Sequence, residues 1–185
     1  TTLTINITGL NDGPVAYSDS DSAQDDSVVA SGNVLSNDSD IDNGAMLDVK
    51  SVNGSDVGGD STITVNGSYG DLTMNSDGSY SYTVTDESLA QGAIGTETFS
   101  YVVTDEWGDT DTTTLTIDIT GLNDDPVAYS DSNTASDDSI PASGNVLSND
   151  SDVDDGAMLD VKSVGGTMLG SDGTISVNGS YGDLT

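Results

Sequence analysis

Hydrophobic and polar residues alternate along several stretches of the chain, as they do in β-strands with one buried face. Residues 2–8, for example, place Leu3, Ile5 and Ile7 on the same face. The stretches that we expect to form strands are 2–8, 14–17, 46–52, 61–65, 70–74, 79–85, 98–104 and 113–120. Helical periodicity is absent, although 86–94 has room for one turn.

Two short polar segments between predicted strands, 75–78 and 105–108, end in glycine. Gly78 and Gly108 can adopt the left-handed conformation that closes a hairpin. About seven or eight strands, each with one apolar face, are typical of a sandwich. The pattern therefore predicts an all-β fold, an antiparallel Greek-key β-sandwich.

The chain repeats itself with a period of 112 residues: residues 1–73 align without a gap onto 113–185 and differ at 16 positions. This period is the length of a whole domain, which predicts sandwiches in tandem. We expect 1–12 to be the last strand of a preceding repeat and its linker, 13–124 a complete repeat, and 125–185 the first part of the next. We also expect the chain to be a segment of a longer protein.

The charge balance excludes several classes of function. The chain has 33 acidic and 2 basic residues, a net charge of −31, and neither His nor Cys. It therefore lacks the residues of a Ser-His-Asp triad, a cysteine nucleophile or the usual zinc and haem sites. Two basic side chains cannot neutralise the phosphates of a nucleic acid or bind an anionic membrane surface. The apolar runs are too short for membrane insertion. No pair of carboxylates is marked as lying in a cleft, so we expect no enzymatic activity.

Self-repulsion at this charge opposes folding. The acids are nevertheless clustered in short segments between predicted strands whose alternation is regular. Of the 33 acids, 30 are Asp, whose short side chain suits tight chelating loops. We therefore expect cations to occupy the Asp clusters.

The strongest site signal is the pattern N-D-x-D-x-D-x-G in residues 36–44, repeated in 148–156. Alternate acids in a loop that ends in glycine can direct their oxygens to one centre, as Ca²⁺ requires. The spacing is not that of an EF-hand, and the alternative is a solvated acidic turn. The candidate ligands are Asn37, Asp38, Asp40, Asp42, Asn149, Asp150, Asp152 and Asp154.

Two further segments offer ligands. The interdomain linker 9–14 and its copy 121–126 carry Asn11, Asp12, Asn123 and Asp124, which could share an ion between domains or form only a turn before proline. The hairpin tip 104–111 carries Asp105, Asp109 and Asp111, with a solvated polar hairpin as the alternative. The tip and the linker that follows it lie at opposite ends of the last strand.

Four more acids precede the first loop, and we expect them to be solvated: Asp19, Asp21, Asp25 and Asp26. Asp19 and Asp25 are candidates for outer ligands. Lys50 and its counterpart Lys162 are expected to be exposed strand residues, with an isopeptide bond as the alternative. Trp107 could stack on a sugar ring or cap the sandwich edge.

The order of motifs along the period is specific. It runs from P-V-A after N-D, through G-N-V-L-S-N-D-S-D-x-D, L-x-V-x-S-V, D-G-S-Y-x-Y and F-x-Y-x-V-T-D-x-x-G-x-T-D, to T-L-T-I-x-I-T-G-x-N-D. This order resembles the bacterial cadherin-like (VCBS-type) repeats of large RTX adhesins. The resemblance implies a Ca²⁺-binding, Ig/cadherin-like sandwich, with ligands in the N-D-x-D-x-D loop and the linker N-D. It also implies type I secretion to the extracellular surface of a Gram-negative bacterium and a role in attachment or biofilm formation.

Two functions are compatible with a Ca²⁺-binding domain of this kind. The first is a Ca²⁺-rigidified extender, a spacer whose partners are the neighbouring repeats. The alternative is a Ca²⁺-dependent carbohydrate-binding module, whose partner is an extracellular polysaccharide.

Overall fold

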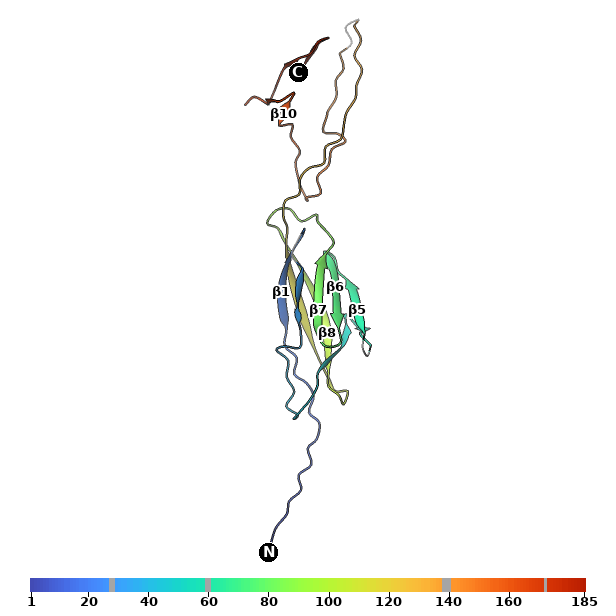
Figure 1. The fold of residues 1–185 in the computed structure, drawn as a ribbon, viewed down its shortest axis with the longest axis vertical. Helices are drawn as coiled ribbons and strands as arrows, with labels where there is room; N and C mark the ends of the chain where they lie inside the picture. Colours follow the sequence, from blue (N-terminus) through green and yellow to red (C-terminus); the bar gives the residue numbers. More distant parts are fainter. Residues whose placement is uncertain (27–28, 59–60, 138–140, 172) are drawn as a thin grey trace. The chain divides into compact units, whose positions relative to one another are not determined.

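The computed structural model describes residues 1–26, 29–58, 61–137, 141–171 and 173–185. The chain divides into two compact units, Thr1–Leu122 and Asn123–Thr185. The first unit is a sandwich of two β-sheets, which confirms the all-β prediction (Figure 1). Among the described residues there is no helix of any kind, and hence none that could cross a membrane.

The five-stranded sheet of the first unit consists, in spatial order, of β1 (Asp19–Gln24), β9 (Thr110–Thr120), β8 (Ile94–Thr104), β3 (Asp48–Val52) and β4 (Ser55–Asp56). The facing sheet consists of β2 (Ala30–Asn33), β7 (Ser79–Val84), β6 (Gly70–Asn75) and β5 (Thr62–Asn66). Neighbouring strands are antiparallel except that β1 runs parallel to β9. The long β8–β9 hairpin extends from one end of the sandwich to the other.

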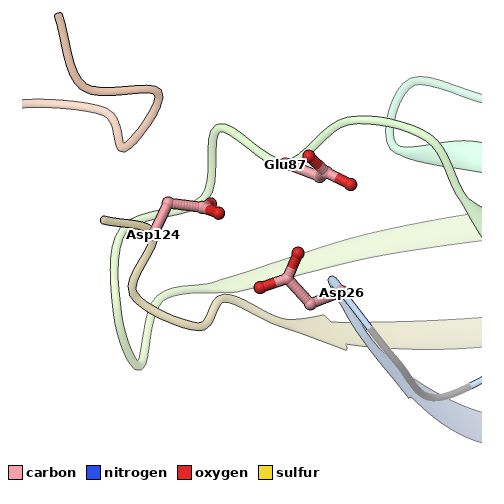
Figure 2. A group of neighbouring side chains, drawn as sticks. All are labelled: Asp26, Glu87 and Asp124. Atoms are coloured by element: carbon pink, nitrogen blue, oxygen red, sulfur yellow. The ribbon is translucent and has the colours of Figure 1, made fainter. Parts of the chain in front are cut away.

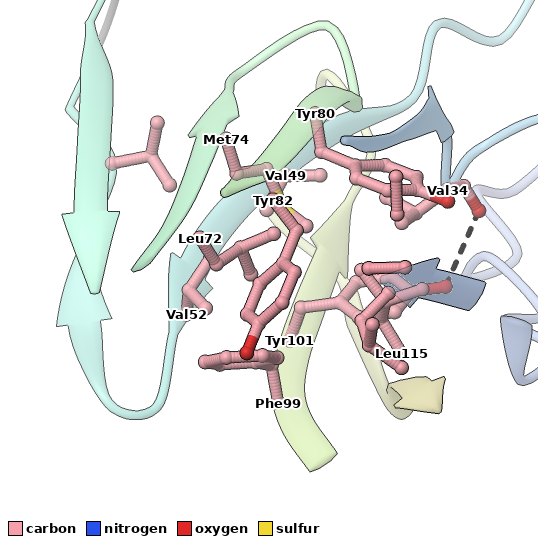
Figure 3. Packing of buried hydrophobic residues seen from close by; sticks show 14 of the residues in the cluster. Val34, Val49, Val52, Leu72, Met74, Tyr80, Tyr82, Phe99, Tyr101 and Leu115 are labelled. Carbon is pink, nitrogen blue, oxygen red and sulfur yellow. Dashed lines mark hydrogen bonds between the residues drawn. The ribbon is translucent and has the colours of Figure 1, made fainter. Parts of the chain in front are cut away.

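The core lies between the two sheets and is built from the alternating faces seen in the sequence (Figure 3). Every second residue is buried along β8, along the second half of β9 and, in the facing sheet, along β6; β7 buries Tyr80 and Tyr82. The rings of Tyr82 and Phe99 meet across the sheets at a centroid distance of 6.0 Å. Burial of these side chains is the main stabilising contribution to the fold.

Both glycine-ended hairpin turns are confirmed. Gly78, between β6 and β7, has a φ of +81°, and Gly108, between β8 and β9, has a φ of +96°. Both values lie in the left-handed region that glycine adopts without a steric penalty.

The prediction of a strand at 2–8 is wrong. Strand β1 is the first strand in the chain, and Ile5 is 72% exposed, whereas its counterpart Ile117 in β9 is completely buried. The two segments have nearly the same sequence, but β9 lies between β8 and β1. No strand among the described residues pairs with 2–8, so the alternating pattern of this segment does not produce a strand.

The segment 14–17 was also predicted as a strand, and it forms only an isolated antiparallel bridge between Val15 and Ser39. Conversely, the pattern did not predict β1, β2 or β4. Strand β1 has the sequence DSDSAQ, which lacks an apolar alternation, and it turns Asp19, Asp21 and Ala23 towards the sandwich. It forms because β9 offers it a ladder of backbone partners.

The second unit contains two short two-stranded sheets, β10 (Ser163–Val164) with β11 (Thr167–Met168) and β12 (Val177–Asn178) with β13 (Asp183–Leu184). None of its described residues is buried. Residues 123–185 correspond to 11–73 of the first unit, so they contain no counterparts of β7, β8 and β9, which supply much of the core of the first unit.

Candidate metal centre

In the first unit, the structure brings together the linker 9–14, the acidic loop 36–44 and the hairpin tip 104–111. The side-chain amide of Asn11 donates to Oδ2 of Asp105 at 2.8 Å and to Oδ2 of Asp109 at 2.7 Å. The backbone amide of Asp12 donates to Oδ2 of Asp42 at 2.8 Å. The tip therefore lies at the same end of the sandwich as the linker that precedes the domain.

The acidic loop holds the chain as it enters the sandwich. Tyr17 donates its backbone amide to Oδ1 of Asp38 at 2.7 Å, and Asp42 donates its own to Oδ1 of Asp40 at 2.8 Å. The bridge of Val15 with Ser39 joins the same two segments. Asp and Asn at alternate positions are suited to such bonds because their short side chains reach nearby backbone amides.

The carboxylates of Asp105 in the tip and Asp111 in β9 mainly accept hydrogen bonds from backbone amides. Oδ1 of Asp105 accepts the amides of Trp107, Gly108 and Asp109, and its Oδ2 accepts the amide of Asn11. The bond from Asn11 and those backbone bonds hold the pKa of Asp105 below its usual value. Asp105 therefore shapes the turn with both of its oxygens.

Asp111 connects the tip to the entering chain. Its Oδ2 accepts the amide of Ala16 at 2.9 Å, and its Oδ1 accepts the amide of Thr112. These two bonds lower the pKa of Asp111. Its charge therefore persists beside Asp38 over the whole neutral and mildly acidic range.

Two carboxylate oxygens of the loop are unsatisfied. Oδ2 of Asp38 and Oδ2 of Asp40 are buried, and neither has a hydrogen-bond partner among the described residues. Burial raises the pKa of Asp38, and the charges of Asp19 and Asp111 raise it further. A buried carboxylate near like charges is costly unless a cation compensates it.

The donor set fits Ca²⁺. Every candidate ligand in the loop supplies oxygen, and carboxylate and amide oxygens are the ligands of this hard cation. Asp38 and Asp40 would bind it through their unpartnered oxygens, and Ca²⁺ would offset the repulsion among the acids. Asn37, by contrast, uses its side-chain NH₂ towards the carbonyl of Ser18, at 3.4 Å.

Asp19 and Asp25, which the sequence offered as outer ligands, have different positions. Asp19 is half-buried on β1, its charge acts on Asp38, and its Oδ2 accepts the hydroxyl of Tyr101 at 2.7 Å. Asp25 is buried at the far end of β9 from the tip, where its Oδ1 accepts the amide of Leu122 at 2.6 Å. Asp25 is thus neither solvated nor a ligand of the 36–44 loop. Because β1 runs parallel to β9, Asp19 lies at the start of β1 on the side of the acidic loop, and Asp25 follows its other end.

The second unit reproduces the loop. Asp124 donates its amide to Oδ2 of Asp154 at 3.1 Å, Tyr129 to Oδ1 of Asp150 at 2.8 Å, and Asp154 to Oδ1 of Asp152 at 3.0 Å. Asn149 repeats the contact of Asn37, and Oδ1 of Asp154 is buried and unpartnered among the described residues. Because residues 123–185 contain no counterpart of the tip, the bonds within the loop and between the loop and the entering chain form without it.

The linker amide differs between the two units. Asn123 has no tip to bind within its own unit, and its side chain donates to the carbonyl of Asp124 at 2.6 Å. The contact of Asn11 with Asp105 and Asp109 is therefore a tertiary feature of the first unit.

Two acids that are not among the predicted ligands lie close together at the end of the first unit opposite the acidic loop. Carboxylate oxygens of Asp26 and Glu87 are within 4.8 Å of each other (Figure 2). Asp124, drawn in the same view, belongs to the second unit. Asp26 and Glu87 are exposed, and a pair of exposed acids does not define a site by itself.

The three other residues singled out from the sequence are exposed. Lys50 lies on the surface of β3, as expected, whereas Lys162 is exposed but lies just before β10 and not in a strand. Trp107 is 76% exposed at the hairpin tip, so it does not cap the sandwich edge.

Comparison with known proteins agrees with this architecture. Residues 11–121 match the model of the bacterial cadherin-like domain. The chain is also 34% identical over 182 residues to the calcium-binding lectin RapA2 of Rhizobium johnstonii, an alignment that covers 91% of this chain and 75% of the relative. The chain belongs to the bacterial cadherin-like domain family.

Proposed function

We propose that the chain is part of a bacterial surface adhesin and that its domains act as Ca²⁺-rigidified extenders. The adhesin would be extracellular, exported by type I secretion to the surface of a Gram-negative bacterium, where it would support attachment or biofilm formation. In this role the domains hold a distal binding region away from the cell and have no enzymatic activity.

One observation carries the proposal. Asp38 and Asp42 each bind a backbone amide of the chain that enters the domain, at Tyr17 and Asp12 respectively. Oδ2 of Asp38 is left buried and unpartnered among the described residues, as is Oδ2 of Asp40, which follows it in the loop. A cation bound by these oxygens would fix the loop, and the loop would fix the direction of the linker.

Such a device suits a spacer because short linkers with small interfaces normally permit domain motion. Proline adds stiffness, since Pro14 and Pro126 fix their own φ and restrict the residue before them. The cation would supply a further constraint on the linker.

Small-angle scattering on a chain of several repeats tests the extender function. We expect an extended and rigid particle in Ca²⁺, and a more flexible or more compact one after chelation, while circular dichroism shows that the domains stay folded. Asp40→Ala should reproduce the chelated profile in Ca²⁺, whereas Asp56→Ala, on the exposed strand β4, should not. An unchanged maximum dimension and flexibility after chelation would contradict the proposal.

A second candidate function is Ca²⁺-dependent binding of an extracellular polysaccharide. It is favoured by the relative's name, a calcium-binding lectin, and by the exposure of Trp107 on the tip that contacts the linker. Aromatic rings that project into solvent can stack on sugar rings. A glycan array in Ca²⁺ tests it: binding that Trp107→Ala or chelation abolishes would support this function, and no binding in Ca²⁺ would exclude it for the glycans tested.

A further inference from the structure

Three tyrosines of the core direct their hydroxyl groups to carboxylates. Tyr80 donates to Asp21 at 2.9 Å, Tyr82 to Glu97 at 2.7 Å and Tyr101 to Asp19 at 2.7 Å. Tyr82 and Tyr101 are both completely buried. A buried hydroxyl bonded to a carboxylate is a strong, charge-assisted contact that fixes the orientation of the acid.

Tyr101 differs from Tyr82 in what surrounds its hydroxyl. Besides Asp19, the carbonyl oxygens of Tyr17 and Val34 each lie 3.2 Å from it (the bond to Val34 is dashed in Figure 3). Tyr17 is the residue whose amide binds Asp38, and Val34 lies two residues before the acidic loop. The hydroxyl of Tyr101 thus lies beneath the segments that form the candidate metal centre.

The single hydroxyl proton can serve one acceptor at a time, and the shortest contact is to Oδ2 of Asp19. Among the described residues, no protein donor forms a hydrogen bond with Oδ1 of Asp19. Asp19 is close enough to Asp38 for its charge to act on that carboxylate, as does the charge of Asp111.

We propose that Asp19 is a ligand of the cation held by the 36–44 loop and that Tyr101 is its positioning residue. Tyr101 holds one oxygen of Asp19 from inside the core, which leaves the other for the ion bound by the free oxygen of Asp38. Outer-shell partners of this kind orient metal ligands, and their loss typically weakens metal binding by about 10–100-fold. This inference rests on the proposed Ca²⁺ site.

The test is calorimetric Ca²⁺ titration of decalcified chain 1–185, with Asp152→Ala present throughout to disable the loop of the second unit. The variants are Tyr101→Phe, the matched control Tyr82→Phe, Asp19→Asn, and Tyr101→Phe combined with Asp19→Asn. Each variant is also melted without Ca²⁺, because both tyrosine variants lose one buried hydroxyl bonded to a carboxylate.

We expect Tyr101→Phe to raise the Kd for Ca²⁺ by about tenfold. Tyr82→Phe should leave the Kd unchanged, although both variants lower the melting temperature of the Ca²⁺-free protein to a similar extent. Asp19→Asn should weaken binding at least as much, and adding Tyr101→Phe to it should cause no further loss, because the two residues act through one oxygen.

Equal rises in Kd for the two tyrosine variants would overturn the proposal, as would an undiminished effect of Tyr101→Phe in the Asp19→Asn background. Should Tyr101→Phe fail to fold, an unchanged Kd in Asp19→Asn would overturn it and a raised one would support it. Asp38→Ala distinguishes a failure of the proposed Ca²⁺ site from a failure of the role of Tyr101. If it leaves the Kd unchanged, the Ca²⁺ site itself is wrong. If it weakens binding while Tyr101→Phe does not, only the role of Tyr101 is wrong.

Discussion

The backbone amide of Tyr17 donates to Oδ1 of Asp38 at 2.7 Å, and Oδ2 of the same carboxylate is buried without a partner among the described residues. One side chain therefore holds the entering chain with one oxygen, while its other oxygen is free to bind a cation. The position of the chain that enters the sandwich at Tyr17 should therefore depend on whether a cation is bound in the acidic loop.

Removing Ca²⁺ should lower the melting temperature of the first unit. An ion that binds only the folded state stabilises it by RT ln(1 + [L]/Kd), about 2.7 kcal/mol at a hundredfold excess over Kd. Calorimetry with and without a chelator at low salt measures the effect. Coincident melting curves would mean that the loop is a solvated turn.

Asp40→Ala and Asp42→Ala should each weaken Ca²⁺ binding without unfolding the first unit in millimolar Ca²⁺. Asp40 loses a buried, unpartnered oxygen, and Asp42 loses the acceptor of the Asp12 amide. Asp56→Ala removes the same charge from exposed strand β4 and should have no effect. Similar losses in all three variants, measured by calorimetric titration, would indicate general electrostatics in place of coordination.

Mild acid should stabilise the Ca²⁺-free first unit. Burial raises the pKa of Asp19 and of Asp38 above the ordinary value of 3.8, so the folded protein takes up protons before the unfolded chain does. Unfolding free energy therefore rises as the pH falls through the raised pKa values towards 3.8. Below 3.8 the trend reverses, because protonation of Asp105 and Asp111, whose pKa values are lowered, removes their stabilising bonds.

Thermal melts of chelated protein between pH 7 and pH 3 measure this dependence. The gain above pH 3.8 should be smaller in Asp38→Asn, which cannot take up the proton. In Ca²⁺ the affinity should fall over the same interval, because protons compete for the ligands. A gain of the same size in Asp38→Asn would assign it to the net charge of the whole chain.

Ile5→Ala and Ile117→Ala change the same position of the repeat and should have different effects. Ile117 is completely buried in β9, so its truncation should lower the free energy of unfolding by about 2–5 kcal/mol. Ile5 is 72% exposed, and its truncation should leave stability unchanged. Urea denaturation of the two variants makes the comparison, and a comparable loss in both would show that residues 2–8 are packed in solution.

Local sequence by itself determined several parts of this protein. Alternation predicted β7 and the last two-thirds of β8, and glycine predicted the turns at Gly78 and Gly108. The acidic loop is determined in a similar way, since the second unit builds it from equivalent residues although none of that unit's described residues is buried. The turns depend on backbone preferences, and the loop depends on hydrogen bonds within it and to the chain 21–30 residues before it. Both sets of residues are copied together in each repeat.

Tertiary structure alone decided the rest. Nearly identical segments are an exposed chain at 2–8 and a buried strand in β9, because only β9 has neighbours on both sides. Asn11 meets Asp105 across 94 residues, and Tyr101 meets Asp19 across 82. Asp19 points inward because the polar strand β1 pairs with β9. The sequence of β1 has no hydrophobic alternation from which this pairing could be predicted. Contacts at such separations depend on which strands lie side by side, and that is settled by burial of the whole core and not by any segment on its own.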